Sequence, residues 1–175
     1  MIEIRQATMA DAEAVANVLQ ASITQLCETD HKNDEYTLTR WLRNKTPETV
    51  AKWIAREDNF LVVAVRDGGV CGVGAITRQG SLDLCYVQPT MQSHGVGLKL
   101  LTALEEQARQ WGLPEIRLVS TSKARSFYEK HGYVADGEPT KGYGVLMDYK
   151  YVKTAQPGAA PLPSAPLTGP SEGDR

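Results

Sequence analysis

A glycine-containing segment has the residue types of an anion-binding loop. The apolar stretch Leu82–Val87 ends before Pro89, and Gln92 to Gly97 then opens a stretch with leucines at helical spacing. Glycines lack Cβ, so phosphate oxygens approach their main chain closely, and the first turn of a helix carries unpaired N–H groups at the positive end of its dipole. The segment therefore predicts a site for a phosphate-bearing cofactor, with a plain strand-to-helix turn as the alternative.

The spacing of the glycines indicates which kind of phosphate-bearing cofactor this segment could bind. A dinucleotide fingerprint needs a third glycine shortly after the second, whereas no glycine lies between Gly97 and Gly112. The nucleoside triphosphate loop needs Gly-Lys-Ser/Thr, which the sequence lacks. A nicotinamide enzyme that uses Gly95 and Gly97 stays as an alternative, and it predicts stabilisation by NAD(H).

Two elements together resemble a known family. Gln92 to Gly97 is similar to motif A of the GNAT superfamily of acyl-CoA-dependent N-acyltransferases, Gln/Arg-x-x-Gly-x-Gly/Ala. Residues 119–133, VSTSKARSFYEKHGY, resemble motif B, with Thr121 where Asn is usual. The positions of motif B are matched by Ala124, Phe127, Tyr128, Gly132 and Tyr133. The resemblance covers residues 2–151 and implies a GNAT-like fold.

The resemblance implies acetyl-CoA, or a close acyl-CoA, as co-substrate. The loop backbone would wrap the pyrophosphate, and the pantetheine arm would pair with the strand backbone before the loop, where an N–H group holds the thioester oxygen. Lys99 could add charge near the adenosine phosphates or be a solvated helix lysine. The expected cofactor contacts are Tyr86, Val87, Gln92, Ser93, His94, Gly95, Val96, Gly97 and Thr121.

Two residues are candidates for proton transfer. Tyr128 lies on the tyrosine position of motif B, and a phenol with a pKa near 10 can protonate a departing thiolate; the alternative is a buried aromatic side chain. The histone-acetylating branch has a glutamate where this chain has Ser81. Asp83, two residues on and on the same strand face, could take the amine proton through water. A solvated strand carboxylate, or a water chain with no dedicated base, remains open.

The elements that must position these residues follow from periodicity. Strands are expected at residues 2–7, 60–66, 70–77, 81–87, 115–119, 133–136 and 144–151, and helices at 8–26, 36–43, 46–54, 95–111 and 122–131. This order predicts an α/β fold with a mixed, mostly antiparallel sheet of about six to seven strands flanked by helices. Residues 1–153 form one domain, and the Pro-rich stretch 154–175 is expected to be a disordered tail.

Composition limits the class of protein. The 175 residues are 42% hydrophobic and 23% charged with a net charge of −2, so we expect neither nucleic-acid nor membrane binding. No signal peptide or membrane span is indicated. Three separate cysteines, Cys27, Cys71 and Cys85, suggest a reduced cytoplasmic protein without a metal site. A monomer or homodimer is expected.

Acceptor recognition is assigned to the region before Phe60, the variable part of such proteins. Carboxylates beside aromatics suit a cationic amine, although a solvated loop over core tryptophans explains them too. These residues are Glu28, Asp30, Asp34, Glu35, Tyr36, Trp41 and Trp53.

All three histidines, His31, His94 and His131, are interpreted as surface residues. The leading hypothesis is N-acetyl transfer to a primary amine of a small molecule or peptide in a ternary complex, without an acyl-cysteine at Cys85. The alternative is a non-catalytic CoA sensor or interaction module.

Overall fold

The computed structural model describes residues 1–154. The disordered tail predicted for residues 154–175 lies outside the described residues, apart from Thr154, which ends the last strand. Among the described residues, no helix is long and apolar enough to cross a membrane.

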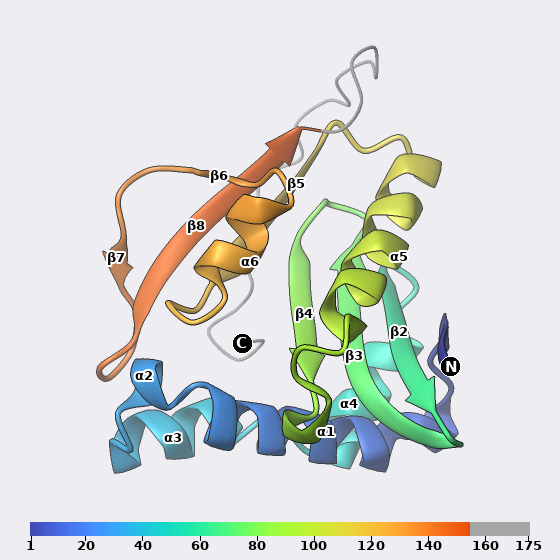
Figure 1. Ribbon diagram of the computed structural model, residues 1–175, viewed down its shortest axis with the longest axis horizontal. Coiled ribbons are helices and arrows are strands. Elements are labelled where there is room, and N and C mark those ends of the chain that lie inside the picture. Colours follow the sequence, from blue (N-terminus) through green and yellow to red (C-terminus); the bar gives the residue numbers. More distant parts are fainter. Residues whose placement is uncertain (155–175) are drawn as a thin grey trace.

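Residues 1–154 form two antiparallel sheets and six α-helices (Figure 1). The strands are β1 (Ile2–Gln6), β2 (Asn59–Arg66), β3 (Gly69–Thr77) and β4 (Leu82–Val87) in the first sheet, and β5 (Glu115–Ser120), β6 (Val134–Ala135), β7 (Thr140–Lys141) and β8 (Met147–Thr154) in the second. The helices are α1 (Ala12–Leu26), α2 (Glu28–His31), α3 (Glu35–Leu42), α4 (Pro47–Ala55), α5 (Val96–Gln110) and α6 (Arg125–Lys130). Single 3₁₀ turns precede α1 (Met9–Asp11) and follow β4 (Pro89–Met91). The predicted α/β class with helices on both sides of a mostly antiparallel sheet is confirmed.

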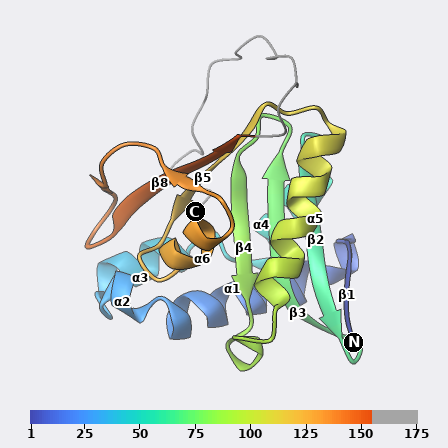
Figure 2. The ribbon, with the colours of Figure 1, turned by 45° about the horizontal axis from the view of Figure 1, so that its top comes forward.

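Helices cover both faces of the first sheet, in the order β1-β2-β3-β4. Figure 2 shows α5 over one face and α1 behind the other. The buried side of α5 carries Leu101, Leu104 and Ala108, as their helical spacing predicts, together with Leu100. Leu98, which the same spacing places on that side, is exposed instead. Gly72 lets the helix approach closely, since a Cβ there would lie 2.8 Å from Val96 Cγ1.

The two sheets touch at one point and then diverge. Among residues 1–154, the ladder between them consists of the parallel bridge from Ser81 to Arg117. Gly80 permits this approach, because at φ +85° a Cβ would lie 2.7 Å from the Glu115 carbonyl oxygen. Past the bridge the second sheet leans away from β4 toward α2 and α3 (Figure 1). The β4 edge that faces β5 is therefore left open.

The sequence missed three features of this fold. Residues 27–35, expected to be a loop, contain α2 and begin α3. The two-residue strand β7 was not predicted, and residues 1–154 contain eight strands, close to the six to seven expected. In β4, Leu82 pairs with Ile76 and Leu84 with Ala75, which leaves Asp83 as an extra residue in a β-bulge.

Candidate active site

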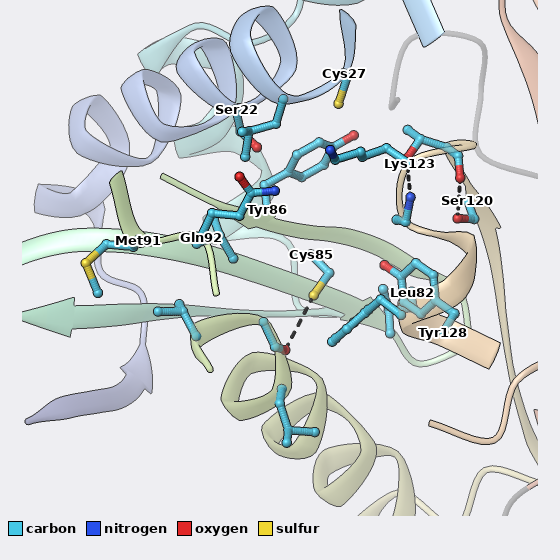
Figure 3. Close-up of a pocket in the computed structure, with 18 of the residues that line it drawn as sticks. Ser22, Cys27, Leu82, Cys85, Tyr86, Met91, Gln92, Ser120, Lys123 and Tyr128 are labelled. Atoms are coloured by element: carbon cyan, nitrogen blue, oxygen red, sulfur yellow. Dashed lines mark hydrogen bonds between the residues drawn. The ribbon is translucent and has the colours of Figure 1, made fainter. Parts of the chain in front are cut away.

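A cavity of about 540 Å³ fills the opening between β4 and β5 (Figure 3). Its walls are β4, the loop before α5, the end of β5, α6 and the last turns of α1. The catalytic residues and cofactor contacts expected from the sequence all line this cavity except His94. His94 is exposed, and its Nδ1 lies 2.9 Å from the Gln92 carbonyl oxygen.

The loop before α5 carries uncommitted backbone donors, that is, N–H groups without a hydrogen-bond acceptor among the described residues. Ser93 and Gly95 have left-handed backbones with φ values of 65° and 78°, and α5 begins at Val96 without a side-chain cap. Among the described residues, no acceptor is found for the N–H groups of Ser93, Gly95, Val96, Gly97 and Leu98. Such donors at the positive end of a helix dipole fit a pyrophosphate.

Strand β4 lies between the two sides of the cavity. Cys85 and Val87 pack on the α5 side, whereas Leu84 and Tyr86 pack on the α1 side. Its open edge gives backbone groups to which an amide-containing chain can bind as an extra strand. The bulge at Asp83 turns that carboxylate to the cavity, where it accepts a hydrogen bond from the Ser81 hydroxyl.

Tyr128 is held at the α6 side of the cavity with its hydroxyl protonated. Its side chain is 6% exposed and packs edge-on against Phe127 and Tyr133. Burial raises its pKa well above the usual value, and the nearby Cys85 raises it further through charge and a hydrogen bond. The residue is therefore a buried aromatic side chain whose hydroxyl keeps its proton, and its burial does not exclude the acid role predicted from the sequence.

The surroundings of Cys85 favour its protonated thiol at neutral pH. Burial raises the pKa of its thiol to about 12, and Sγ lies 3.9 Å from the Gly97 carbonyl oxygen. Because the thiolate is the reactive form, an acyl-cysteine step has no support here. Among the described residues, no group of three or more His, Cys, Asp or Glu side chains could hold a metal ion.

The acidic residues expected beside the acceptor do not line the cavity. Asp34 caps α3 by accepting from Thr37 N–H, and Glu28 accepts from the exposed Asn33. Asp30 is buried and accepts from the backbone N–H groups of Ser122 and Lys123. Among the described lining residues, Asp83 is the one carboxylate.

The surface assignment of His31 was wrong. Its side chain is 0% exposed, and Nε2 lies 3.1 Å from the Ile23 carbonyl oxygen at the end of α1. Nδ1 accepts from the backbone N–H of Asn33. The histidine joins α1 to α2, a contact that sequence periodicity could not reveal because the helix α2 was itself unrecognised.

Sequence reasoning also missed several cavity residues. The last turns of α1 contribute Ser22, Leu26 and Cys27, and the loop after β5 contributes Lys123. The α1 residues continue a helical face that the sequence did show, but only the divergence of β4 and β5 makes that face part of a cavity. Lys123 occupies a variable position of motif B and carried no signal by type or spacing.

Known proteins resemble this chain in sequence. Residues 15–151 match the model of the acetyltransferase (GNAT) domain family. A protein from Azospirillum brasilense named IAA acetyltransferase is 34% identical over 99 residues. That match spans 52% of this chain and 64%, less than two thirds, of the relative.

Solved structures share the fold. A GCN5-related N-acetyltransferase from Rhodopseudomonas palustris has a TM-score of 0.77 at 24% identity, covering 87% of this chain and 95% of that one. PaiA N-acetyltransferase from Thermoplasma acidophilum, solved with coenzyme A, has a TM-score of 0.76 at 24% identity, covering 89% and 99%. YncA from Salmonella typhimurium, solved with acetyl-CoA, has a TM-score of 0.70 at 21% identity, covering 92% and 98%.

Proposed function

The chain belongs to the GNAT acetyltransferase family, and from that premise we propose that it transfers the acetyl group of acetyl-CoA to a primary amine. Bound acetyl-CoA would supply the thioester carbonyl that the amine attacks directly, without a covalent enzyme adduct. One observation carries the proposal: the uncommitted donors of the loop before α5, the open edge of β4 and the Tyr128 hydroxyl all border one cavity.

The loop and the strand edge divide the binding of acetyl-CoA between them. The N–H groups from Ser93 to Leu98 are suited to hold the pyrophosphate, as the unpaired donors of a helix start do. The open edge of β4 at Tyr86 and Val87 is suited to pair with the pantetheine amides, and a backbone N–H there would hold the thioester oxygen. Lys130, which also lines the cavity, adds positive charge on the α6 side.

Proton movement is assigned to two side chains. Tyr128 keeps its proton through neutral pH because burial raises its pKa, so it is available to protonate the departing thiolate. Asp83 borders the same cavity from the β-bulge and is proposed to take the amine proton through a water molecule. Both roles require that the amine reaches the cavity beside β4.

Acetyl-CoA consumption across amino acids, polyamines, aminoglycosides and peptide N-termini tests this function. We expect turnover with at least one acceptor and a loss of about 10²- to 10³-fold in kcat for Tyr128→Phe, with little change in CoA affinity. The control Tyr149→Phe removes a hydroxyl that does not border the cavity and should keep full activity. Tight CoA binding without turnover on any acceptor would instead identify a sensor.

A further inference from the structure

The cavity has two chemically different ends, one on each side of β4. The α5 end holds the uncommitted N–H donors, to which the proposed function assigns acetyl-CoA. The other end lies against α1, where Ser22 and Cys27 border it together with Tyr86 (Figure 3). Because the cofactor occupies the α5 end, the amine must enter from the α1 end. The residues at that end therefore decide which amine is accepted.

The side chain that extends across the α1 end is a lysine. Figure 3 shows Lys123 reaching from the loop after β5 toward Tyr86, below Cys27. Its charge acts on the thiol of Cys27 by lowering the pKa that burial raises, which places the ammonium near the end of α1. Lys123 thus lies on the α1 side of β4, opposite the loop donors.

The ammonium of Lys123 makes no ion pair with any residue of the described chain. Asp30 on α2 contacts this loop with its two oxygens on the backbone N–H groups of Ser122 and Lys123, at 2.7 Å and 3.4 Å. Asp30 therefore fixes the backbone of the loop and makes no ion pair with the ammonium of Lys123. A fixed backbone and an available positive charge are what a binding site for an anion requires.

The α1 end of the cavity also has a neutral polar group, the hydroxyl of Tyr86. Tyr86 belongs to a cluster with Trp41 and Tyr143, and burial raises the pKa of its hydroxyl, which therefore stays a hydrogen-bond donor. The one carboxylate of the described lining, Asp83, lies on the β-bulge at the other end of β4. The α1 end of the lining therefore offers a cation and a hydroxyl donor, and these groups suit a carboxylate on the acceptor, in addition to the amine expected from the sequence.

We propose that the acceptor is a small amine that carries a carboxylate, as a free amino acid does, and that Lys123 binds the carboxylate while the amine faces β4. This inference rests on the proposed acetyl transfer and names its substrate class. Tyr86 donates a second hydrogen bond to the carboxylate. Lys123 is thus a specificity residue and takes no part in the chemical step.

Matched acceptors test the proposal. The kcat/KM of leucine, phenylalanine and tyrosine is compared with that of their amides and of isoamylamine, phenethylamine and tyramine, corrected for the fraction of unprotonated amine. We expect a preference of about 10- to 100-fold for the carboxylates, the range of a charge-assisted hydrogen bond. Lys123→Met should abolish that preference through KM, and Lys123→Arg should restore most of it. Lys52→Met, an exposed lysine of α4 away from the cavity, is the matched control and should keep the preference.

Other outcomes separate this inference from the function on which it rests. Equal rates on carboxylates and neutral amines, or turnover on polyamines alone, would overturn the substrate class and leave acetyl transfer standing. A Lys123→Met variant that loses acetyl-CoA affinity and slows all acceptors equally would place Lys123 at the cofactor and overturn its role. No turnover on any amine would overturn both.

Discussion

At the scale of single residues, Tyr128 and Cys85 lie together at the cavity and share an environment that keeps both side chains protonated. Burial raises the pKa of both groups, so the phenol and the thiol stay protonated together. A nucleophilic cysteine needs the opposite environment, one that lowers its pKa. The side chains therefore support direct transfer with an acid and disfavour a covalent intermediate on the enzyme.

The raised pKa of Tyr128 predicts the shape of the pH profile. An acid whose pKa lies well above its usual value remains protonated at higher pH, so its function persists throughout the neutral and mildly alkaline range. The acceptor amine attacks only in its unprotonated form, so the rate rises with pH as the amine loses its proton. The rate kcat/KM should therefore rise between about pH 6 and about pH 9 without a falling limb. Measurement of kcat/KM over this range checks it, and a falling limb that disappears in Tyr128→Phe would contradict the raised pKa.

At the scale of elements, one close contact determines whether the cavity exists. The sheets meet where the Arg117 N–H donates to the Gly80 carbonyl oxygen at 2.9 Å, and they diverge beyond it. Divergence leaves the β4 edge open for a ligand and lets α6 bring Tyr128 to it. The β-bulge at Asp83 comes two residues after Ser81, where the sheets meet, and it turns the Asp83 carboxylate to the cavity.

Gly80→Ala should weaken this contact. A Cβ would lie 2.7 Å from the Glu115 carbonyl oxygen, and φ is +85°, so β5 must move and the backbone is strained. We expect a loss of about 3 kcal/mol in the free energy of unfolding, together with reduced activity. The control Gly68→Ala has the same strain at φ +81° with no atom within 4 Å, and should cost about 1 kcal/mol with activity kept. Equal losses for the two variants in denaturant titrations would contradict the role of Gly80.

The sequence predicted elements whose signal is local. Apolar segments bounded by turn residues located the strands of the first sheet, and the glycines of residues 92–97 located the start of α5. The sequence failed where a long-range contact determines the structure. Helix α2 is a single turn of polar residues, held because Asp30 accepts from Ser122, 92 positions away, and because His31 bonds the end of α1. No periodicity can signal such contacts, so His31 was misplaced and Lys123 was not noticed.

At the scale of the whole molecule, the segment from α2 to α3 joins the two sheets. Asp30 on α2 holds the loop after β5, and Thr37 on α3 accepts from the Val145 N–H before β8. A Cβ on Gly144 would overlap Thr37, which shows how closely these parts meet. Because the loop held by Asp30 carries Lys123, which lines the cavity, we expect this segment to connect acceptor binding to the stability of the second sheet.

Asp30→Ala tests this connection. The variant leaves the N–H groups of Ser122 and Lys123 without their acceptor, which should lower the free energy of unfolding by about 1 to 3 kcal/mol. Because the loop then no longer holds Lys123 in place, KM for the acceptor should rise more than the Kd for CoA. The control Glu28→Ala removes an exposed carboxylate of the same helix and should change stability by less than about 0.5 kcal/mol. An unchanged acceptor KM in Asp30→Ala would contradict the connection.

The central claim, that the loop before α5 binds acetyl-CoA, is tested most directly by calorimetric titration of acetyl-CoA into the wild type, Gly95→Ala and Gly112→Ala. The two glycines flank α5 with φ values of +78° and +67°, and a Cβ at either meets no atom within 4 Å. Both variants should therefore lose about 1 kcal/mol of stability. We predict that acetyl-CoA binds the wild type in preference to NADH, and that its affinity falls about 10-fold or more in Gly95→Ala alone, because the methyl group crowds the phosphate site. Binding of NADH without acetyl-CoA, or equal acetyl-CoA affinity in all three proteins, would contradict the account.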